Sequence, residues 1–387
     1  MTSTGSRLDH LECPECRTTV PADRLATTCP TCGHALFAVY RTSDWSVVDW
    51  RASLRERPAT LWRYRELLPV RESSSIVSLG EGFSPVLSLG AIPEAPTIDL
   101  WLKDDGGLPT GSFKARGMTA AVSRARELGV RAFFVPSAGN AAVALAAYAA
   151  RAARSARVYL PESTPAPMVG ACRRYGATVV QVPGTIREAG VAARAAEASQ
   201  GAFDLSTLRE PYRAEGKKTM GLEIWEQFGD DRMPDAIVYP TGGGTGLIGM
   251  FRAFAQLREL GGLERPPRLY AVQPDGCAPV VKAWNDGAAR AEPFPDPHTI
   301  APGLLVPAPF SSERVLEALR GTGGGALAVP DAEISRAVER LASRHGISAS
   351  PEGAATYAAV RPLVERGWVR DGERVLLYNT GSGIPFL

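Results

Sequence analysis

From residue 99 to the end of the chain, short apolar runs alternate with longer amphipathic segments. A short apolar run predicts a buried strand, and apolar positions three or four residues apart predict a helix with one buried face. In the segment 115–128, Met118, Val122 and Ala125 share such a face. The predicted strands are 99–103, 131–136, 157–160, 178–182, 236–239, 269–273 and 375–379, and the predicted helices are 115–128, 141–152, 167–175, 186–199, 215–228, 247–260, 331–345 and 352–366.

This alternation is typical of parallel sheets that are covered by helices on both faces. We therefore predict the α/β class, with open, twisted, mainly parallel sheets. The length of 387 residues suggests two or three domains. The region 44–94 is expected to connect the N-terminal segment to the first strand, with a few helical stretches.

Composition narrows the range of partners. Hydrophobic residues make up 45% and charged residues 22% of the chain, as in soluble globular proteins. The 43 basic and 41 acidic residues nearly balance, so we expect no nucleic-acid partner. The alanine-rich stretch 141–153 is shorter than the roughly 20 residues of a membrane span, and the polar start 1–12 does not resemble a secretion signal. We expect a cytoplasmic protein with no membrane partner.

Four of the six cysteines lie in two C-x-x-C pairs near the N-terminus, Cys13 with Cys16 and Cys29 with Cys32. Each pair can form a turn that points two sulfur atoms at one ion, and two turns complete a tetrahedral site. Four thiolates leave no open position, so we predict structural zinc. The alternatives are a knuckle that folds without metal or one that oxidises.

One lysine opens a predicted helix directly after a glycine-rich turn. Lys114 follows Gly106-Gly107-Leu108-Pro109-Thr110-Gly111-Ser112-Phe113. The helix macrodipole disfavours a cation at this end and lowers the pKa of the amine. Such an amine can form a Schiff base with an aldehyde cofactor. The alternative is an ordinary surface lysine at a helix start.

Three more loops follow predicted strands, where ligands bind in parallel sheets. The backbone of Ser137-Ala138-Gly139-Asn140-Ala141 can bind a carboxylate at a helix start. The loop Thr241-Gly242-Gly243-Gly244-Thr245-Gly246 lets the backbone approach a monophosphate. Hydroxyl groups in Asn379-Thr380-Gly381-Ser382-Gly383 can contact a ligand. The first and last loops could also be simple turns. Because other catalytic motifs are missing, we expect the chemistry to come from a cofactor.

In this order, the four loops resemble those of the fold-type II pyridoxal 5′-phosphate (PLP) enzymes, and of threonine synthases in particular. Three further stretches resemble the zinc-ribbon-bearing bacterial threonine synthases. They are Leu205-Ser206-Thr207-Leu208 continuing through Tyr212-Arg213-Ala214-Glu215-Gly216-Lys217-Lys218-Thr219, then Gly276-Cys277-Ala278-Pro279, and Pro351-Glu352-Gly353-Ala354-Ala355-Thr356. The resemblance covers about residues 79–385 and extends to the cysteine pairs.

The resemblance implies a tryptophan-synthase-β-like fold and a homodimer. It implies three parts: a zinc-ribbon-like segment 1–42, a large PLP-binding domain 43–116 with 233–387, and a smaller mobile domain 117–232 for the substrate carboxylate. It also implies roles for single residues. Lys114 would be the Schiff-base lysine, Asn140 would contact the cofactor 3′-oxygen, and Thr380 would hydrogen-bond the pyridine nitrogen. The cofactor phosphate would be bound by Gly242, Gly243, Gly244, Thr245 and Gly246. The substrate would be contacted by Ser137, Gly139, Ala141, Arg213, Lys217 and Lys218.

The reaction implied is conversion of O-phospho-L-homoserine and water to L-threonine and phosphate, through β,γ-elimination and replacement. The chain departs from the family at Ala115, Ala138 and Ala141, where acidic or hydroxyl groups often stand. Related β-replacement or elimination enzymes therefore stay open: cysteate synthase, threonine or serine dehydratase, or an enzyme of specialised metabolism. A third class is a binding protein that retains the cofactor, or a zinc-ribbon nucleic-acid binder. Lys217 and Lys218 could also be solvated helix charges.

Overall fold

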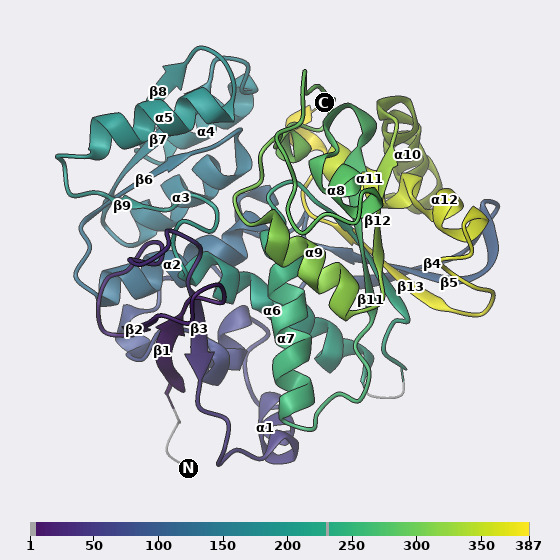
Figure 1. Cartoon of the computed structure of the whole chain (residues 1–387), viewed down its shortest axis with the longest axis horizontal. Coiled ribbons are helices and arrows are strands. Elements are labelled where there is room, and N and C mark those ends of the chain that lie inside the picture. Colours follow the sequence, from purple (N-terminus) through teal and green to yellow (C-terminus); the bar gives the residue numbers. More distant parts are fainter. Residues whose placement is uncertain (1–4, 230–231, 387) are drawn as a thin grey trace. The chain divides into compact units, whose positions relative to one another are not determined.

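The computed structural model describes residues 5–229 and 232–386 (Figure 1). The chain forms two compact units. Unit 1 comprises Met1–Phe83 with Lys114–Thr219, and unit 2 comprises Ser84–Phe113 with Met220–Leu387. The described residues form three sheets, one of which belongs to unit 2.

Unit 1 begins with a small antiparallel sheet of strand order β2-β1-β3, which carries the cysteine pairs in its turns. Its strands are β1 (Leu8–Glu12), β2 (Thr19–Pro21) and β3 (Phe37–Tyr40). The region that follows contains the helix α1 (Val47–Leu54) and the 3-10 helix η1 (Leu61–Leu67). We call residues 5–40 the ribbon.

The second sheet of unit 1 is parallel, with the order β8-β7-β6-β9. Its strands are β6 (Ala132–Pro136), β7 (Ser155–Pro161), β8 (Thr178–Val182) and β9 (Phe203–Asp204). The helices α3 (Asn140–Arg151), α4 (Ala166–Arg174) and α5 (Ile186–Glu197) pack against it. Helix α2 (Lys114–Glu127) packs on α3. Small residues on α5, Ala189 and Ala193, allow it to lie close to the aromatic side chains Phe134 and Tyr159.

The sheet of unit 2 has the order β12-β11-β10-β13-β5-β4, and it is parallel except for the edge strand β4. The strands are β4 (Val86–Ile92), β5 (Ala95–Asp104), β10 (Ala236–Pro240), β11 (Arg268–Pro274), β12 (Gly325–Val329) and β13 (Arg374–Asn379). The helices are α7 (Thr245–Glu259), α8 (Pro279–Asn285), α9 (Ser312–Gly321), α10 (Asp331–His345), α11 (Pro351–Ala358) and α12 (Val360–Glu365). Every residue of β10 is buried, as expected for a strand that is covered on both faces.

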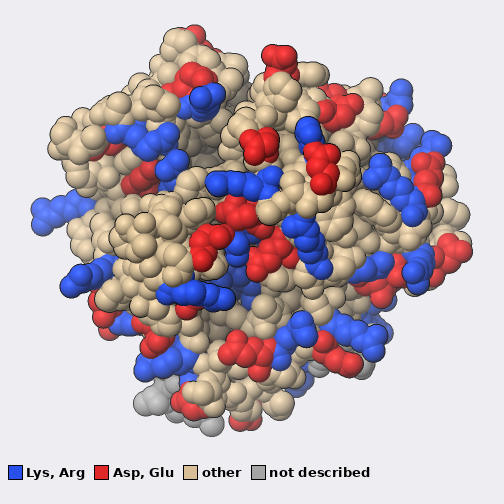
Figure 2. Space-filling view, in the orientation of Figure 1, with Lys and Arg blue, Asp and Glu red and all other residues tan. Residues whose placement is uncertain are grey.

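Helix α6 (Tyr212–Phe228) contributes its first eight residues to unit 1 and the rest to unit 2. Among the described residues, no helix combines the length and the apolar character that a membrane crossing needs. Basic and acidic side chains are interspersed on the face shown in Figure 2, in keeping with the net charge of +2.

The structure confirms the predicted α/β class and contains a strand at each of the seven predicted positions. The prediction of one helix over 352–366 is wrong, because the segment forms the two helices α11 and α12. Pro362 has no N–H group to donate to the carbonyl of Ala358, so the helical ladder is interrupted there. In the two larger sheets the strands β4, β9 and β12 were not predicted, and each lies at an edge of its sheet.

Candidate functional site

Three of the predicted loops leave the sheet of unit 2 at the same end of its strands. Strand β13 lies between β5 and β10 and runs parallel to both. The loops that follow these strands therefore meet at their carboxyl ends. The Thr380 loop lies in the middle, with the loop 105–113 on one side and the loop 241–244 on the other. The carboxyl ends of the strands are where ligands bind in open α/β sheets.

Backbone hydrogen bonds tie the loop before Lys114 to the Thr380 loop. The N–H of Phe113 donates to the carbonyl of Thr380 at 2.9 Å, and the N–H of Ser382 donates to the carbonyl of Gly111 at 2.8 Å. At the base of the loop, the Asn379 amide donates to the Asp104 carboxylate at 2.8 Å. Phe113, the residue directly before Lys114, is thus held in place by the Thr380 loop.

The same loop contains polar groups that the protein itself does not satisfy. The Oγ atom of Ser112 and the Oγ1 atom of Thr110 are buried, and neither has a hydrogen-bond partner among the described residues. Thr110 also has a φ of 65°, which is strained for a residue with a branched side chain. A buried hydroxyl without a partner costs about 1–3 kcal/mol. Strain and unsatisfied hydroxyls together fit a loop that binds a polar ligand such as PLP.

Glycine is required in the loop before α7, because neighbouring atoms leave no room for side chains. A Cβ atom at Gly242 would lie 2.6 Å from the carbonyl oxygen of Gly303, and one at Gly246 would lie 2.0 Å from the Tyr239 hydroxyl. Gly244 is the N-cap of α7, has a φ of +73° and provides no side-chain cap. The backbone N–H groups of the first turn are therefore available to an anion, as the phosphate prediction requires.

A buried carboxylate positions this glycine loop from a distance in sequence. The Oε1 atom of Glu352, which is 5% exposed, accepts a hydrogen bond of 2.7 Å from the N–H of Gly303. Gly303 in turn forms the wall beside Gly242. The sequence places Glu352 in the stretch 351–356 but does not indicate this function.

In unit 1, the predicted carboxylate-binding loop connects β6 to α3. The Ser137 Oγ atom accepts hydrogen bonds from the N–H groups of Gly139 at 3.0 Å and Ala142 at 3.2 Å. Gly139 has a φ of 139°, and a Cβ atom there would lie 2.1 Å from the Met168 sulfur. Asn140 is the first residue of α3. The Ser137 hydroxyl therefore fixes the backbone of the loop, and Asn140 lies at the helix start that follows.

The start of α6 carries the predicted phosphate contacts Arg213 and Lys217, both 1% exposed. Glu210 caps this helix: its carboxylate accepts hydrogen bonds from the N–H groups of Tyr212 at 2.7 Å and Arg213 at 3.1 Å. Burial raises the pKa of Glu210 to about 7, although the nearby Arg213 opposes this effect. Sequence reasoning missed Glu210. An acidic residue directly before Pro211 at a helix start is a capping signal that could have indicated it.

Lys218 is already engaged within unit 1. Its ammonium group lies 2.6 Å from the Glu215 carboxylate, and both side chains are fully buried. The same ammonium lies 3.9 Å from the centre of the Tyr40 ring in β3. Lys218 therefore connects α6 to the ribbon, and its contact with substrate stays a prediction.

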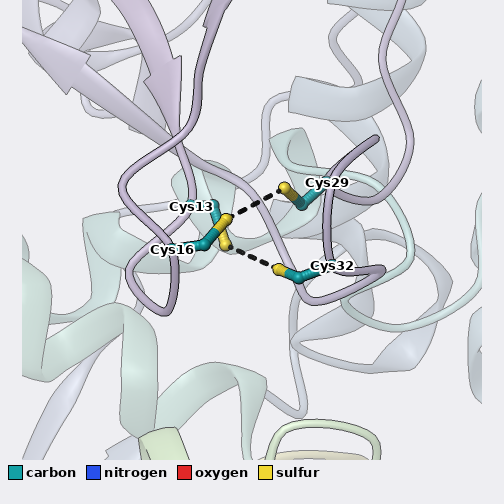
Figure 3. A group of neighbouring side chains, drawn as sticks. All are labelled: Cys13, Cys16, Cys29 and Cys32. Atoms are coloured by element: carbon teal, nitrogen blue, oxygen red, sulfur yellow. Dashed lines mark hydrogen bonds between the residues drawn. The ribbon is translucent and has the colours of Figure 1, made fainter.

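The four cysteines of the ribbon point their sulfur atoms at one another (Figure 3). All four Sγ atoms lie within 4.8 Å of one another. The distances are 3.4 Å from Cys13 to Cys32 and 3.5 Å from Cys16 to Cys29. Tetrahedral zinc with Zn–S bonds of about 2.3 Å needs sulfur atoms about 3.8 Å apart, so the cluster fits this ion.

The two cysteine turns reach the same backbone shape by different residues. The N–H of Gly33 donates to the carbonyl of Cys29, and the N–H of Arg17 donates to the carbonyl of Cys13, each at 2.9 Å. Gly33 has a φ of +75° and Arg17 a φ of 60°. The glycine that follows the second cysteine pair therefore has a strained, non-glycine counterpart after the first pair.

Comparisons with known proteins show what this chain is similar to. The family model described as "Pyridoxal-phosphate dependent enzyme" matches residues 77–381. A threonine synthase of Methanocaldococcus jannaschii is 34% identical over 374 residues, which covers 96% of this chain and 92% of that protein. A threonine synthase of Methanosarcina acetivorans is also 34% identical, with coverage of 96% and 91%.

Solved structures share the fold. Maize serine racemase matches with a TM-score of 0.67 and 21% identity, over 78% of this chain and 88% of that one. A processed threonine deaminase isoform from Solanum lycopersicum matches with a TM-score of 0.67 and 21% identity, over 94% and 95%. The chain is therefore a member of the family of pyridoxal-phosphate-dependent enzymes, and its curated relatives in that family include threonine synthases.

Proposed function

We propose that this enzyme is a threonine synthase that converts O-phospho-L-homoserine and water to L-threonine and phosphate. The observation that carries the proposal is the 34% identity to archaeal threonine synthases over 96% of the chain. The buried basic residues at the start of α6 support it, because they suit a substrate that bears a phosphate group.

We assign each part of the cofactor to residues of one of the two units. Lys114, which begins α2, would hold PLP covalently, and Asn140 at the start of α3 would contact its 3′-oxygen. Gly242, Gly243, Gly244, Thr245 and Gly246 would hold its phosphate, and Thr380 would contact the ring nitrogen. When bound, PLP supplies the electron sink that stabilises negative charge at the substrate Cα atom.

The residues of the chain then bind the substrate and move its protons. The loop of Ser137, Gly139 and Ala141 would orient the substrate carboxylate, and Arg213, Lys217 and Lys218 would attract its phosphate. The freed Nζ atom of Lys114 would take the proton from Cα and serve the transfers at Cβ and Cγ. Phosphate leaves from Cγ with the bridging oxygen, and water adds its oxygen at Cβ. A positioned base contributes about 10²–10⁴ to the rate of each transfer.

A second candidate is a β-replacement or elimination enzyme on the same scaffold. Ala138 and Ala141 favour it, because they replace hydroxyl groups that threonine synthases often place near the substrate. One solved threonine deaminase matches the fold with a TM-score of 0.59 and 26% identity. Cysteate synthase and threonine or serine dehydratase are the reactions to compare.

The purified holoenzyme distinguishes these reactions when it is offered one substrate at a time. We expect phosphate and threonine from O-phospho-L-homoserine, at a rate far above that with phosphoserine plus sulfite or with threonine alone. A protein that converts phosphoserine and sulfite but leaves phosphohomoserine unchanged would be a cysteate synthase. Release of ammonia from threonine or serine alone would identify a dehydratase.

We also propose that Cys13, Cys16, Cys29 and Cys32 bind one structural zinc ion. The guanidinium of Arg124 on α2 donates to the carbonyl of Ala22 in the ribbon at 2.7 Å, so the ion would stabilise a segment that packs against α2. Metal analysis should give one zinc per chain, and Cys29→Ser should lose it. Cys172→Ser, at a buried cysteine of α4, is the matched control and should retain the metal. Equal metal content in both variants would disprove the site.

A further inference from the structure

Helices α2 and α6 cross at two glycines, which brings Lys217 next to the start of α2. A Cβ atom at Gly216 would lie 1.9 Å from the carbonyl oxygen of Arg116. A Cβ atom at Gly117 would lie 3.2 Å from the Cε atom of Lys217. The helices therefore touch backbone to backbone, and the side chain of Lys217 runs past Gly117, less than one turn after Lys114.

Five ionisable groups of unit 1 interact around this crossing, and three of them are basic. The basic groups are Lys217, Arg213 and Lys114, and the acidic groups are Glu210 and Asp204, of which Asp204 acts on Arg213. Arg213 donates from Nη1 to the carbonyl of Leu205. Its Nε and Nη2 atoms are buried without a hydrogen-bond partner among the described residues. A guanidinium with two unsatisfied nitrogen atoms fits a phosphate group, which can accept two parallel hydrogen bonds.

The electrostatics of the crossing favour an uncharged amine on Lys217. Burial lowers the pKa of Lys217 well below its ordinary value, and the charges of Arg213 and Lys114 lower it further. The effects of burial and of Arg213 do not depend on Lys114, whose amine would be bonded to PLP in the holoenzyme. Glu210 opposes these effects, but it also accepts hydrogen bonds from the helix backbone, and burial raises its own pKa to about 7. A phosphate dianion that binds to Arg213 would reverse the balance, because negative charge favours the ammonium form.

We propose that Lys217 is an uncharged amine in the substrate-free site and takes up a proton when a phosphate-bearing ligand binds beside Arg213. The inference rests on the proposed function and deepens it. Arg213 would carry its charge permanently, whereas the charge of Lys217 would appear only with the ligand. Phosphate binding is then coupled to proton uptake, and release of the product phosphate returns the proton.

Calorimetry of the holoenzyme with inorganic phosphate tests this coupling. Titrations at one pH in two buffers with different heats of ionisation give the number of protons taken up. We expect the wild type to take up about one proton more than Lys217→Gln. Protonation of phosphate itself is common to both proteins and cancels in the comparison. Lys282→Gln, at an exposed lysine of α8, is the control and should match the wild type.

The second variant places a permanently charged side chain at the same position. Lys217→Arg should bind phosphate without the extra proton. The dissociation constant of the wild type for phosphate should rise by up to about tenfold per pH unit above neutrality. The dissociation constant of Lys217→Arg should vary less with pH. This variant also answers the test if Lys217→Gln does not fold, as judged by its thermal unfolding. Proton uptake that is the same in wild type, Lys217→Gln and Lys217→Arg would overturn the inference.

The two proposals fail separately. Threonine formation from phosphohomoserine without proton uptake that depends on Lys217 would disprove only the coupling. Proton uptake with phosphate, in a protein that leaves phosphohomoserine unchanged, would support the coupling and disprove the proposed reaction.

Discussion

The molecule has two regions suited to anions, and they use different chemistry. In unit 2, the start of α7 offers backbone N–H groups in a loop without charged side chains, Thr241 to Gly246. In unit 1, the start of α6 offers the ionisable side chains Arg213, Lys217 and Glu210. Backbone amides do not titrate, whereas a buried lysine among other cations can gain and lose a proton.

The difference matches how long each proposed ligand stays. A cofactor that remains bound through many turnovers is best held by donors whose strength does not depend on pH. A substrate phosphate that must leave as product is better held by a charge that can be withdrawn. Donors that do not titrate therefore suit a ligand that stays bound, and donors that titrate suit a ligand that is released.

Replacing Lys114 separates covalent attachment from phosphate binding. Lys114→Ala should reduce turnover of phosphohomoserine by about 10⁴ or more, because several proton transfers lose their base. The glycine loop before α7 is unchanged, so PLP should still bind, but borohydride should no longer fix it to the protein. Phosphate release and the absorbance after borohydride treatment and denaturation measure the two effects. Turnover within tenfold of the wild type would contradict the assigned role, and Lys282→Ala is the control.

The adjacent lysines of α6 should differ strongly in their effect on stability. Lys218→Met removes the ammonium partner of the buried Glu215 carboxylate and should cost about 3–5 kcal/mol of unfolding free energy. Lys217→Met replaces a buried amine beside other cations and should be neutral or stabilising. Urea unfolding followed by tryptophan fluorescence compares the two variants. An equal loss in both would mean that the buried amine of Lys217 stabilises the fold as much as the ion pair of Lys218 does.

The buried cap Glu210 should make stability depend on pH in a defined window. Its pKa in the folded state is about 7, above the ordinary value of 4.5, mainly because of burial. A raised carboxyl pKa stabilises the fold below about pH 4.5, and this contribution is lost as the pH rises to about 7. Glu210→Gln is neutral at every pH, so its stability relative to the wild type should increase over this window by about 3 kcal/mol.

Thermal or urea unfolding at pH 5, 6 and 7 measures this difference. The comparison with Glu210→Gln removes the contribution of all other titrating groups that the two proteins share. A difference that stays constant across the window would show that the carboxyl group keeps an ordinary pKa.

The smallest expected effect concerns the glycine loop. Gly244→Ala would place a Cβ atom 2.2 Å from the Cγ2 atom of Val315 at a φ of +73°. The displaced loop should weaken PLP binding by about tenfold or more, since overpacking costs about 1–3 kcal/mol. Gly261→Ala has nearly the same φ, +74°, with open space around it, and isolates the backbone strain. Spectroscopic titration with PLP measures both, and equal affinity in both variants would contradict this role of the loop.

Much of the fold and the loops could be predicted from the sequence, because their signals are local. The central strands are apolar on both faces, and glycine runs after β5, β10 and β13 mark the loops directly. The strands β4 and β12 escaped prediction because their local signals are weak. Strand β12 consists mostly of glycine and alanine, which are poor strand formers, and β4 is interrupted by register shifts at Gly90.

Residues that act through distant contacts were also not predictable. Glu352 holds the N–H of Gly303, 49 positions away in the chain, and such a pairing leaves no local pattern. The same holds for Gly117 and Gly216, whose role depends on a crossing of two helices. The lowered pKa of Lys217 follows from burial and from its neighbours, neither of which a single sequence reveals.

The fate of oxygen atoms tests the proposed reaction most directly. When the holoenzyme turns over phosphohomoserine in water enriched in oxygen-18, cleavage of the bond between Cγ and oxygen followed by addition of water at Cβ should label the threonine hydroxyl. The released phosphate should then carry no label. Labelled phosphate together with unlabelled homoserine would mean simple hydrolysis of the phosphate ester, and would contradict the account.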